Sequence, residues 1–288
     1  MFNFVKSSKW CALISVVIIL AGAVSLIINR GFEVDIDFAG GCKMVVDTNG
    51  ATNTDRETIK NAVESVEGIK FYESVKMGDN MLQIKTNSNE KFEEIYAAVK
   101  DAAGLKAEKY KSCDNVDPTL SRDLLTNALI ALAVAIVGIL IYICIRFEFG
   151  AAIAAIIALV HDALIMVSAY AIFRFTVNST FVAAVLTIIG YSVNATIIIF
   201  DRVRENKKYA GKNSFEELCN KSIFQTLRRT INTTITTLVA LVCLYVLGAE
   251  SIKAFALPIM IGVLAGTYSS VFISAPVWNL VRGIIKKK

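Results

Sequence analysis

Apolar residues along this chain are gathered into six long runs that are separated by polar segments. A helix needs roughly 20 mostly apolar residues to cross the hydrocarbon core of a bilayer, with a range of about 17 to 25. The predicted spans are residues 10–28, 124–145, 150–173, 177–200, 231–247 and 256–281. The first run exceeds the usual apolar region of a signal peptide and no small-x-small cleavage site follows it, so we expect a permanent span.

The polar segment between the first two spans, residues 30–122, has a pattern that predicts a separate α+β domain. Its predicted order is strand, helix, strand, strand, helix, strand, which is the ferredoxin-like order. The expected elements are a strand or hairpin at 32–46 interrupted by Gly40 and Gly41, a helix from a Thr54–Glu57 capping box to about Val66, strands at 71–75 and 81–85 joined by a turn at 77–80, a helix at 91–103 and a closing strand at 105–111. The chain therefore divides into residues 1–29 with the first span, the 30–122 domain, and a five-helix bundle at 123–288.

The loop at 201–230 has a capping box of its own. Ser214 and Glu217 stand three residues apart, and apolar residues follow at helical spacing. Two interpretations remain open: a short amphipathic helix on the membrane surface, or a solvated connector with a basic face.

Composition agrees with a membrane protein. Hydrophobic residues make up 55% of the 288, the mean hydropathy is +0.56 and there are only three prolines, which is too apolar for soluble domains of this length. The fold class predicted is an α-helical polytopic membrane protein with six transmembrane helices and one α+β ferredoxin-like domain.

Charge is sorted by membrane side. A net charge of +5 alone suggests a nucleic acid or a lipid surface as partner, but the basic residues alternate with the spans. One side holds Lys6, Lys9, Arg146, the basic residues of 201–230, Arg282 and the C-terminal lysines, whereas the short segments on the other side hold Arg174 and Lys253. The positive-inside rule therefore places both termini in the cytoplasm and makes the 30–122 domain extracytoplasmic. No nucleic-acid partner is expected.

Two of the six cysteines lie in the predicted outer domain. Cys11, Cys144, Cys219 and Cys243 fall in or beside apolar segments, where cysteine behaves as a small hydrophobe. Cys42 and Cys113 would lie in an oxidising compartment, which permits a disulfide. Sequence spacing alone leaves both the bridged and the free state open.

Ionisable residues inside spans are the strongest candidates for function. His161, the only histidine, and Asp162 stand near the middle of the third span, where an aspartate costs about 2.5–3.5 kcal/mol to insert. The pair is a candidate for proton binding or relay, and the alternative is polar contact that holds helices together.

The fourth and fifth spans share polar residues. Gly190 and Asn194 lie in the fourth, and a threonine-rich stretch follows Arg229 at the start of the fifth. Small and hydroxylated residues allow close helix approach and interhelical hydrogen bonds. Arg229 has two possible positions, extended to the cytoplasmic interface or turned inward to a carboxylate.

A dense group of charges ends the fourth span, consisting of Asp201, Arg202, Arg204 and Glu205. By itself this group is typical of a helix end at a membrane interface. The sequence contains no G-x-x-x-x-G-K-[ST] motif and no metal-ligand cluster of usable spacing, so no cofactor, metal or nucleotide hydrolysis is expected.

Five motifs stand out along the chain, of which the most specific is GYSVNATIIIFDRVREN at 190–206. The others are VDIDFAGG at 34–41, which contains Phe38, Gly40 and Gly41, a proline before the second span at Pro118, RFEFGAAIAAIIALVHDALI at 146–165, which contains Arg146 and Glu148, and QTLRRTINTTITTL at 225–238. In order and spacing these motifs resemble those of the SecF family, the smaller membrane subunits of bacterial SecD/SecF pairs, and the last of them places Arg229 on the family arginine.

The resemblance implies a fold of the resistance-nodulation-division type and a SecD partner in the bacterial inner membrane. It further implies assistance to the SecYEG channel and the SecA ATPase, with an ion gradient used to pull unfolded preprotein to the outer side. One position departs from the pattern, because Ala195 stands where many members have an aspartate proposed to carry protons. Coupling would then use Asp162, His161, or carboxylates of SecD, and sodium coupling through neutral oxygens is an alternative.

Two further functions compete with this one. A half-size small-molecule exporter of the same superfamily would need a second copy or another half to complete a twelve-span unit. A structural scaffold without ion conduction is favoured by Ala195.

Overall fold

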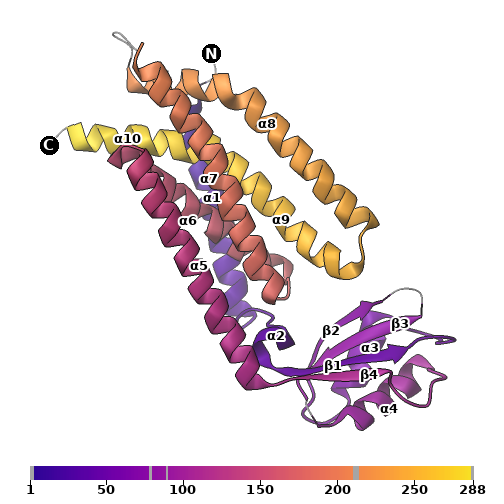
Figure 1. The fold of residues 1–288 in the computed structure, drawn as a ribbon. Helices are drawn as coiled ribbons and strands as arrows, with labels where there is room; N and C mark the ends of the chain where they lie inside the picture. Colours follow the sequence, from indigo (N-terminus) through magenta and orange to yellow (C-terminus); the bar gives the residue numbers. More distant parts are fainter. Residues whose placement is uncertain (1–2, 78–79, 89, 210–213, 287–288) are drawn as a thin grey trace.

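The computed structural model describes residues 3–77, 80–88, 90–209 and 214–286 (Figure 1). Six helical stretches in this part are long and apolar enough to cross a membrane, which confirms the predicted number of spans. They are α1 (Phe4–Ile28), α5 (Pro118–Arg146), α6 (Phe149–Phe173), α7 (Ser179–Lys207), α8 (Phe215–Leu247), and a sixth built from α9 (Glu250–Ser269), a π-helical turn η1 (Ser270–Ser274) and α10 (Ala275–Lys286). The turn expected at 77–80 falls partly on residues outside the described ones.

The six spans differ in how deeply the chain buries them. Half or more of the apolar window is buried in α6, α7 and the sixth span, whereas the windows of α1, α5 and α8 are at most 17% buried. The central helices are rich in alanine, and α6 alone buries Ala151, Ala154, Ala155 and Ala158. The three peripheral helices therefore present most of their surface to lipid or to another protein.

Glycines set the closest helix contacts in the bundle. A Cβ atom at Gly22 of α1 would lie 2.5 Å from the Cβ of Ser168 on α6. At Gly262 and Gly266 of α9, a Cβ would lie 2.0 Å from Ile188 and 3.0 Å from Ser192, both on α7. At these positions small residues let the helix backbones approach each other closely.

Two predictions for the segment between the fourth and fifth spans need correction. The Ser214–Glu217 capping box forms, but it opens the 33-residue helix α8 and no separate surface helix follows within the described residues. Helix α7 also continues to Lys207. The expected loop at 201–230 is consequently short, because both spans extend beyond their apolar windows.

The soluble domain contains β1 (Gly41–Asp47), α3 (Arg56–Glu64), β2 (Phe71–Lys76), β3 (Met81–Thr86), α4 (Phe92–Ala103) and β4 (Ser112–Val116). The predicted α+β domain is confirmed, and its elements follow one another as strand, helix, strand, strand, helix, strand. The sheet is antiparallel with the order β2-β3-β1-β4. Alternate residues of β1, namely Cys42, Met44 and Val46, join the core that α3 and α4 cover, as the two-residue period of a strand requires.

Three local predictions in this domain are wrong. The residues before Gly40 form a short helix, α2 (Ile36–Ala39), instead of a strand. Helix α3 begins after Asp55, and Thr54 is not its cap. The closing strand is the polar segment Ser112–Val116, and not 105–111, because an edge strand pairs through its backbone and needs little apolar periodicity.

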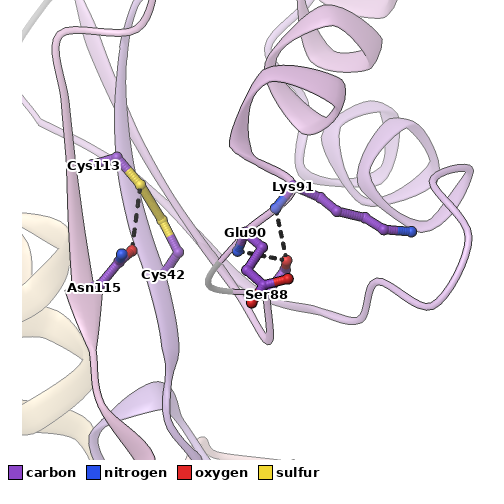
Figure 2. Close-up of a disulfide and its surroundings, with 6 residues drawn as sticks. All are labelled: Cys42, Ser88, Glu90, Lys91, Cys113 and Asn115. Atoms are coloured by element: carbon purple, nitrogen blue, oxygen red, sulfur yellow. Dashed lines mark hydrogen bonds between the residues drawn. A yellow bond between two sulfur atoms is a disulfide. The ribbon is translucent and has the colours of Figure 1, made fainter.

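Cys42 and Cys113 form a disulfide between neighbouring strands (Figure 2). In the β1–β4 register Cys42 stands opposite Asn115 and Cys113 stands opposite Met44, and the Cα atoms of the two cysteines are 6.5 Å apart. The bridge ties the edge strand β4 to the centre of the sheet.

The domain lies at one end of the bundle and both chain ends lie at the other (Figure 1). Because the number of spans is even, both chain ends lie at the same end of the bundle. Helix α2 lies at the junction, where the Ser121 hydroxyl of α5 donates to the carbonyl of Ile36 (3.1 Å). The chain after α1 also pairs with the α6–α7 connection, because Val177 donates to the carbonyl of Glu33 (2.7 Å) and Asp35 donates to that of Val177 (3.0 Å).

Candidate functional site

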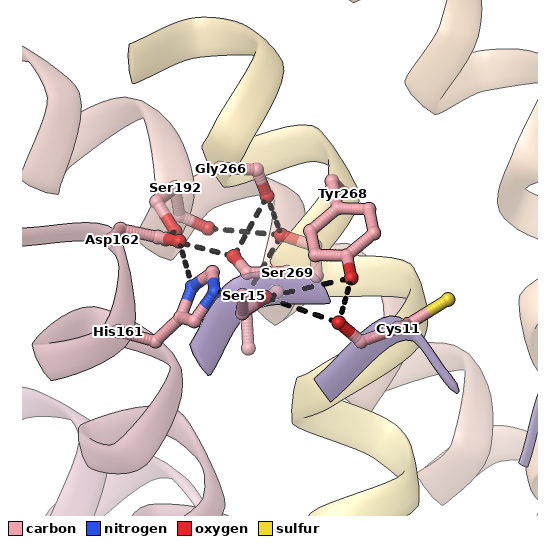
Figure 3. Close-up of polar contacts among 10 residues, drawn as sticks. Cys11, Ser15, His161, Asp162, Ser192, Gly266, Tyr268 and Ser269 are labelled. Carbon is pink, nitrogen blue, oxygen red and sulfur yellow. Dashed lines mark hydrogen bonds and ion pairs between the residues drawn. The ribbon is translucent and has the colours of Figure 1, made fainter. Parts of the chain in front are cut away.

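The two predicted ionisable residues of the third span, His161 and Asp162, lie among polar side chains of neighbouring helices (Figure 3). Asp162 is completely buried and His161 is 9% exposed. Their helix, α6, packs against α1, α7 and α9. The polar pair is therefore surrounded by other helices and not by lipid.

The Asp162 carboxylate takes part in three hydrogen bonds. His161 contacts it through Nδ1, 2.9 Å from Oδ1. On the other oxygen, Ser269 of α9 donates at 2.8 Å and Ser192 of α7 also donates. The carboxylate thus contacts a neighbour on its own helix α6 and one serine each from α7 and α9.

His161 extends the network to the first span. Its Nε2 lies 2.8 Å from the hydroxyl of Ser15 on α1. Ser15 lies 3.5 Å from the hydroxyl of Tyr268, which donates to the carbonyl of Cys11. The hydrogen bonds thus run from α7 and α9 through Asp162 and His161 to α1. We call Asp162, His161, Ser15, Ser192 and Ser269 the buried cluster.

Sequence reasoning identified the two titratable members of the buried cluster, and Ser192 lies within the motif at 190–206 without having been singled out. Ser15 and Ser269 were missed. Both interrupt apolar runs at depth, and a hydroxyl placed there was the available signal. Which serine meets which carboxylate depends on the packing of helices far apart in sequence.

Asn194 and Arg229 do not belong to the buried cluster. Both are exposed in the isolated chain, as is Gly190. In the described part of the chain, the Arg229 guanidinium has no carboxylate within 4 Å and the Asn194 amide has no hydrogen-bond partner. The inward position for Arg229 is therefore not the one the structure shows.

Each of these residues continues a row of polar positions along its helix. On α7 the row is Thr187, Gly190 and Asn194; on α8 it is Arg229, Thr233 and Thr236, all exposed. We call these six residues the open polar stripe. The two helices are joined beside it by the Tyr191 hydroxyl, 2.9 Å from that of Thr234, and Thr234 in turn lies 2.8 Å from Thr267 of α9.

Charged motif residues meet at the end of the bundle away from the domain. Arg146 donates to Asp201 (2.9 Å), which joins α5 to α7. Glu148, the N-cap residue of α6, accepts from Lys207, so the connection between α5 and α6 is linked twice to the end of α7. These pairs are partly exposed, and such pairs contribute little to stability individually. Their position instead fixes the R-F-E segment against the end of α7.

The charged group at the end of the fourth span also contains Arg202, Arg204 and Glu205. Arg202 contacts Glu205 (2.6 Å) and also Gln225 of α8 (2.6 Å). Arg204 is exposed, without an ion pair among the described residues. The interpretation of this group as an interface cap agrees with these contacts.

The motif around Phe38, Gly40 and Gly41 forms the junction between domain and bundle. Phe38 is half-buried in α2. Gly40 ends that helix with φ +75°. At Gly41 φ is +144°, and a Cβ would lie 2.1 Å from the carbonyl oxygen of Thr86, so only glycine fits.

Beside this motif lies a second buried charge group. Lys85 of β3 contacts the fully buried Asp35 (2.6 Å) and Glu73 (2.9 Å). Burial raises the pKa of Asp35 even though Lys85 opposes this. Burial lowers the pKa of Lys85, but the two carboxylates outweigh it and the net pKa is raised. Lys85 is thus held as a cation by two partners.

Comparison with known proteins places the chain among translocase subunits. The family described as "Protein export membrane protein SecD/SecF, C-terminal" matches residues 95–283. SecF of Alicyclobacillus acidocaldarius is 35% identical over the whole chain and 95% of that protein. SecDF of Bacillus subtilis is 37% identical, and the chain spans 39% of its length.

A solved structure agrees with these relatives. The crystal structure of SecDF from Thermus thermophilus, titled a translocon-associated membrane protein, matches the whole chain with a TM-score of 0.82 and 29% identity. The chain again spans 39% of that protein, so it corresponds to one part of the longer SecDF proteins. The chain therefore belongs to the SecF family of multi-pass protein translocase subunits.

Proposed function

We propose that the chain acts with SecD as a gradient-coupled subunit of the preprotein translocase of the bacterial inner membrane, with both termini cytoplasmic and without nucleotide hydrolysis. The observation that carries this proposal is the open polar stripe. Asn194 and Arg229 lie on span surfaces and meet no partner within the described chain. An unsatisfied polar group in hydrocarbon costs several kcal/mol, so these faces need another protein or a water-filled path.

SecD is the partner that supplies such a face most directly. The SecDF relatives carry more than twice the length of this chain in a single polypeptide. The threonine hydroxyls of the stripe bond their own helix, as Thr187 does to the carbonyl of Ala183 (2.8 Å) and Thr233 to that of Arg229 (2.9 Å). What the partner must satisfy is thus the Asn194 amide and the Arg229 guanidinium.

The buried cluster supplies the titratable groups of this chain. Every contact of the Asp162 carboxylate is with a hydrogen-bond donor or with the His161 ring. The Asp162 carboxyl and the His161 imidazole are the groups of this cluster that can exchange a proton, whereas its serine hydroxyls cannot do so near neutral pH. We assign proton exchange to Asp162 and His161, because Ala195 has no titratable group.

The soluble domain would act on the emerging polypeptide. It lies at the end of the bundle opposite both termini, which is the outer side if the termini are cytoplasmic. The unfolded preprotein, delivered by SecA through SecYEG, would meet this domain there. A cycle in the buried cluster would reach it through α6 and α7, whose connection pairs with the residues before α2.

Preprotein translocation into vesicles tests the proposal when the proton and sodium gradients are collapsed separately. Collapse of the proton gradient should slow the late stage of export, and Asp162→Asn should remove that dependence. Asp101→Asn, an exposed aspartate on α4, is the matched control. The proposal is wrong if neither gradient affects the late stage, or if purification gives a homo-oligomer without SecD, as a small-molecule exporter would.

A scaffold role is the second candidate, and Ala195 together with the closed hydrogen bonding of Asp162 favours it. A scaffold would stabilise the complex without moving ions. Asp162→Asn and Arg229→Ala would then leave export and its gradient dependence unchanged. The two functions are therefore separated by the same vesicle assay.

A further inference from the structure

Acidic residues stand at alternate positions of the segment that follows α1, at Glu33, Asp35 and Asp37. Each of the three contacts a different part of the protein. Glu33 accepts from Arg174 at the end of α6 (2.7 Å), and Asp35 contacts Lys85 of the soluble domain (2.6 Å). Asp37 accepts from the backbone N–H and the hydroxyl of Ser179 at the start of α7 (3.1 and 2.8 Å). We call residues 33–37 the acidic segment, and it ties the domain to the ends of two spans.

The contact between Glu33 and Arg174 uses the whole guanidinium group. Arg174 Nε and Nη2 both donate to Glu33 Oε1 (3.1 and 2.7 Å), and Nη1 donates to the carbonyl of Gly31 (3.2 Å). The two side chains are 35% and 39% exposed, so the ion pair contributes little to stability. Its geometry still fixes where the acidic segment lies against the end of α6, because the donors of a guanidinium point in fixed directions.

The backbone of Arg174 has a conformation that disfavours arginine. Arg174 ends α6 with φ +56°, in the left-handed region where glycine or asparagine is the usual residue. In the described part of the chain, Arg30 is the other non-glycine residue with a positive φ, also +56°. The Arg30 side chain is exposed and, within the described ranges, makes no ion pair or side-chain hydrogen bond. A residue kept in an unfavourable conformation points to a role of its side chain, and for Arg174 the contacts with Glu33 and Gly31 supply that role.

Helix α6 connects this contact to the buried cluster. Asp162 lies on the same helix, and Arg174 stands about 18 Å beyond it along the helix axis. No proline interrupts α6 between them, so the helix has no kink there and moves as one element. The hydrogen bonds of the acidic segment to Ser121, Val177 and Ser179 go to residues outside α6. A displacement of α6 therefore reaches the acidic segment directly through Arg174.

We propose that Arg174 is a positioning residue that transmits movement of α6 from the buried cluster to the soluble domain. This role rests on the proposed function, in which Asp162 exchanges protons. Binding of a proton removes the charge of Asp162 and changes its hydrogen bonds to α7 and α9, so α6 shifts against those helices. Arg174 passes the shift through Glu33 to the acidic segment, and Asp35 passes it through Lys85 to β3 of the domain.

Arg174→Gly tests this role because it suits the backbone but removes the guanidinium. Glycine adopts a positive φ freely and the lost ion pair is partly exposed, so the unfolding midpoint of the full chain should stay the same or rise. Stimulation of late export by the proton gradient, measured in vesicles that hold the chain with SecD, should nevertheless fall by about fivefold, the lower end of typical coupling between two sites. Arg30→Gly is the matched control. It makes the same change at the same φ without removing a side-chain contact, and it should leave the stimulation unchanged.

An exchange of charges separates the contact from the residue type. Glu33→Arg alone places two arginines together and should lower the stimulation as Arg174→Gly does. Glu33→Arg combined with Arg174→Glu restores an ion pair with reversed signs and should recover part of the stimulation. A residue that acted only through its own packing would not be rescued in this way.

Hydrogen exchange supplies a readout that does not depend on export. The amides of Asp35 and Val177 bond between the acidic segment and the α6–α7 connection. In the full chain with SecD, Asp162→Asn should change the exchange rates of these two amides. In the Arg174→Gly background the same substitution should leave them unchanged.

The outcomes distinguish this role from the proposed function. Stimulation by the proton gradient that is as large with Arg174→Gly as with the unaltered chain would overturn the role and leave the function intact. An equal loss with Arg30→Gly would also overturn it, because a loosened backbone at the junction would then be the cause. Absence of gradient dependence in the unaltered chain would overturn both.

Discussion

The buried cluster and the open polar stripe place similar side chains in opposite surroundings. Asp162 is fully enclosed, accepts hydrogen bonds from α7 and α9, and shares a third with its neighbour His161. Asn194 and Arg229 stand on the exposed faces of α7 and α8 and, within the described chain, contact no partner. Yet helix α7 contributes to both regions, through Ser192 on one face and Asn194 on another.

The difference shows which polar groups of the spans are satisfied within this chain and which need a partner. A polar group in a membrane helix must be satisfied by other helices, by water or by a second protein. The buried cluster meets that requirement within one chain, so substitutions there should first lower the stability of the chain. The open polar stripe does not meet it, so substitutions there should first weaken assembly with SecD.

The largest expected effect is that of Asp162→Ala. The change leaves His161, Ser192 and Ser269 without their common acceptor, and breaking a buried hydrogen-bonded pair costs about 3–5 kcal/mol. Unfolding of the full chain in mixed micelles by denaturing detergent measures the loss. Asp162→Asn keeps the shape and should cost less, and Asp101→Ala on the exposed face of α4 should change stability by no more than about 0.5 kcal/mol. A small effect of Asp162→Ala would mean that the cluster is not self-sufficient.

The next largest effect is expected in the soluble domain, and it tests whether breaking a buried charge group is as costly there as in the membrane. Lys85→Met leaves Asp35 and Glu73 facing each other without a cation, and should cost about 3 kcal/mol at neutral pH. The pKa of Lys85 is raised in the fold, so its contribution is complete below the ordinary lysine value of 10.5 and is lost as the pH rises through the folded value. Hydrogen exchange of β3 amides in the full chain reports the change.

The matched control for Lys85 is Lys76→Met, at the exposed end of β2. It should leave exchange of the β3 amides unchanged at every pH. A difference between Lys85→Met and the unaltered chain that persists at strongly alkaline pH would show that side-chain packing, and not the charge, stabilises this group.

Two glycines test the same contrast between a surface packed within the chain and a surface open to a partner, without changing any charge. Gly22 faces the backbone and side chain of Ser168, and a Cβ there would come within 2.5 Å, so Gly22→Val should push α1 from α6 and cost about 2 kcal/mol. A Cβ at Gly190, by contrast, would meet no atom of the described chain within 4 Å. Gly190→Val should therefore alter the isolated chain by about 0.5 kcal/mol or less. It should still weaken association with SecD, as copurification would show.

The elements of this fold that depend on local pattern were predictable. Runs of apolar residues predicted the six spans, and a turn between two short segments predicted β2 and β3. The pair His161 and Asp162 was found because charge inside an apolar run is costly. Each of these signals lies within a single stretch of the sequence.

The features that were missed depend on packing between distant stretches. Whether Asn194 faces the bundle or its surroundings is set by how α7 rotates against α6 and α9, and one sequence does not determine that rotation. Ser15 and Ser269 acquire a partner only when α1 and α9 meet α6. Strand β4 has little apolar periodicity and pairs through its backbone, and the more apolar residues before it were mistaken for the strand.

The smallest effect on stability, and the sharpest test of the comparison, is expected for Arg229→Ala. Arg229 stands in line with Thr233 and Thr236, whereas the adjacent Arg228 stands in line with Ile231 and Ile235, because residues three, four and seven apart share a helix face. Both arginines are exposed, so either change should alter unfolding of the isolated chain by no more than about 0.5 kcal/mol. Copurification should then separate them: Arg229→Ala should lower recovery of SecD, and Arg228→Ala, which faces the apolar row, should leave it unchanged. Equal recovery with both variants would show that the open polar stripe is not the SecD-facing surface.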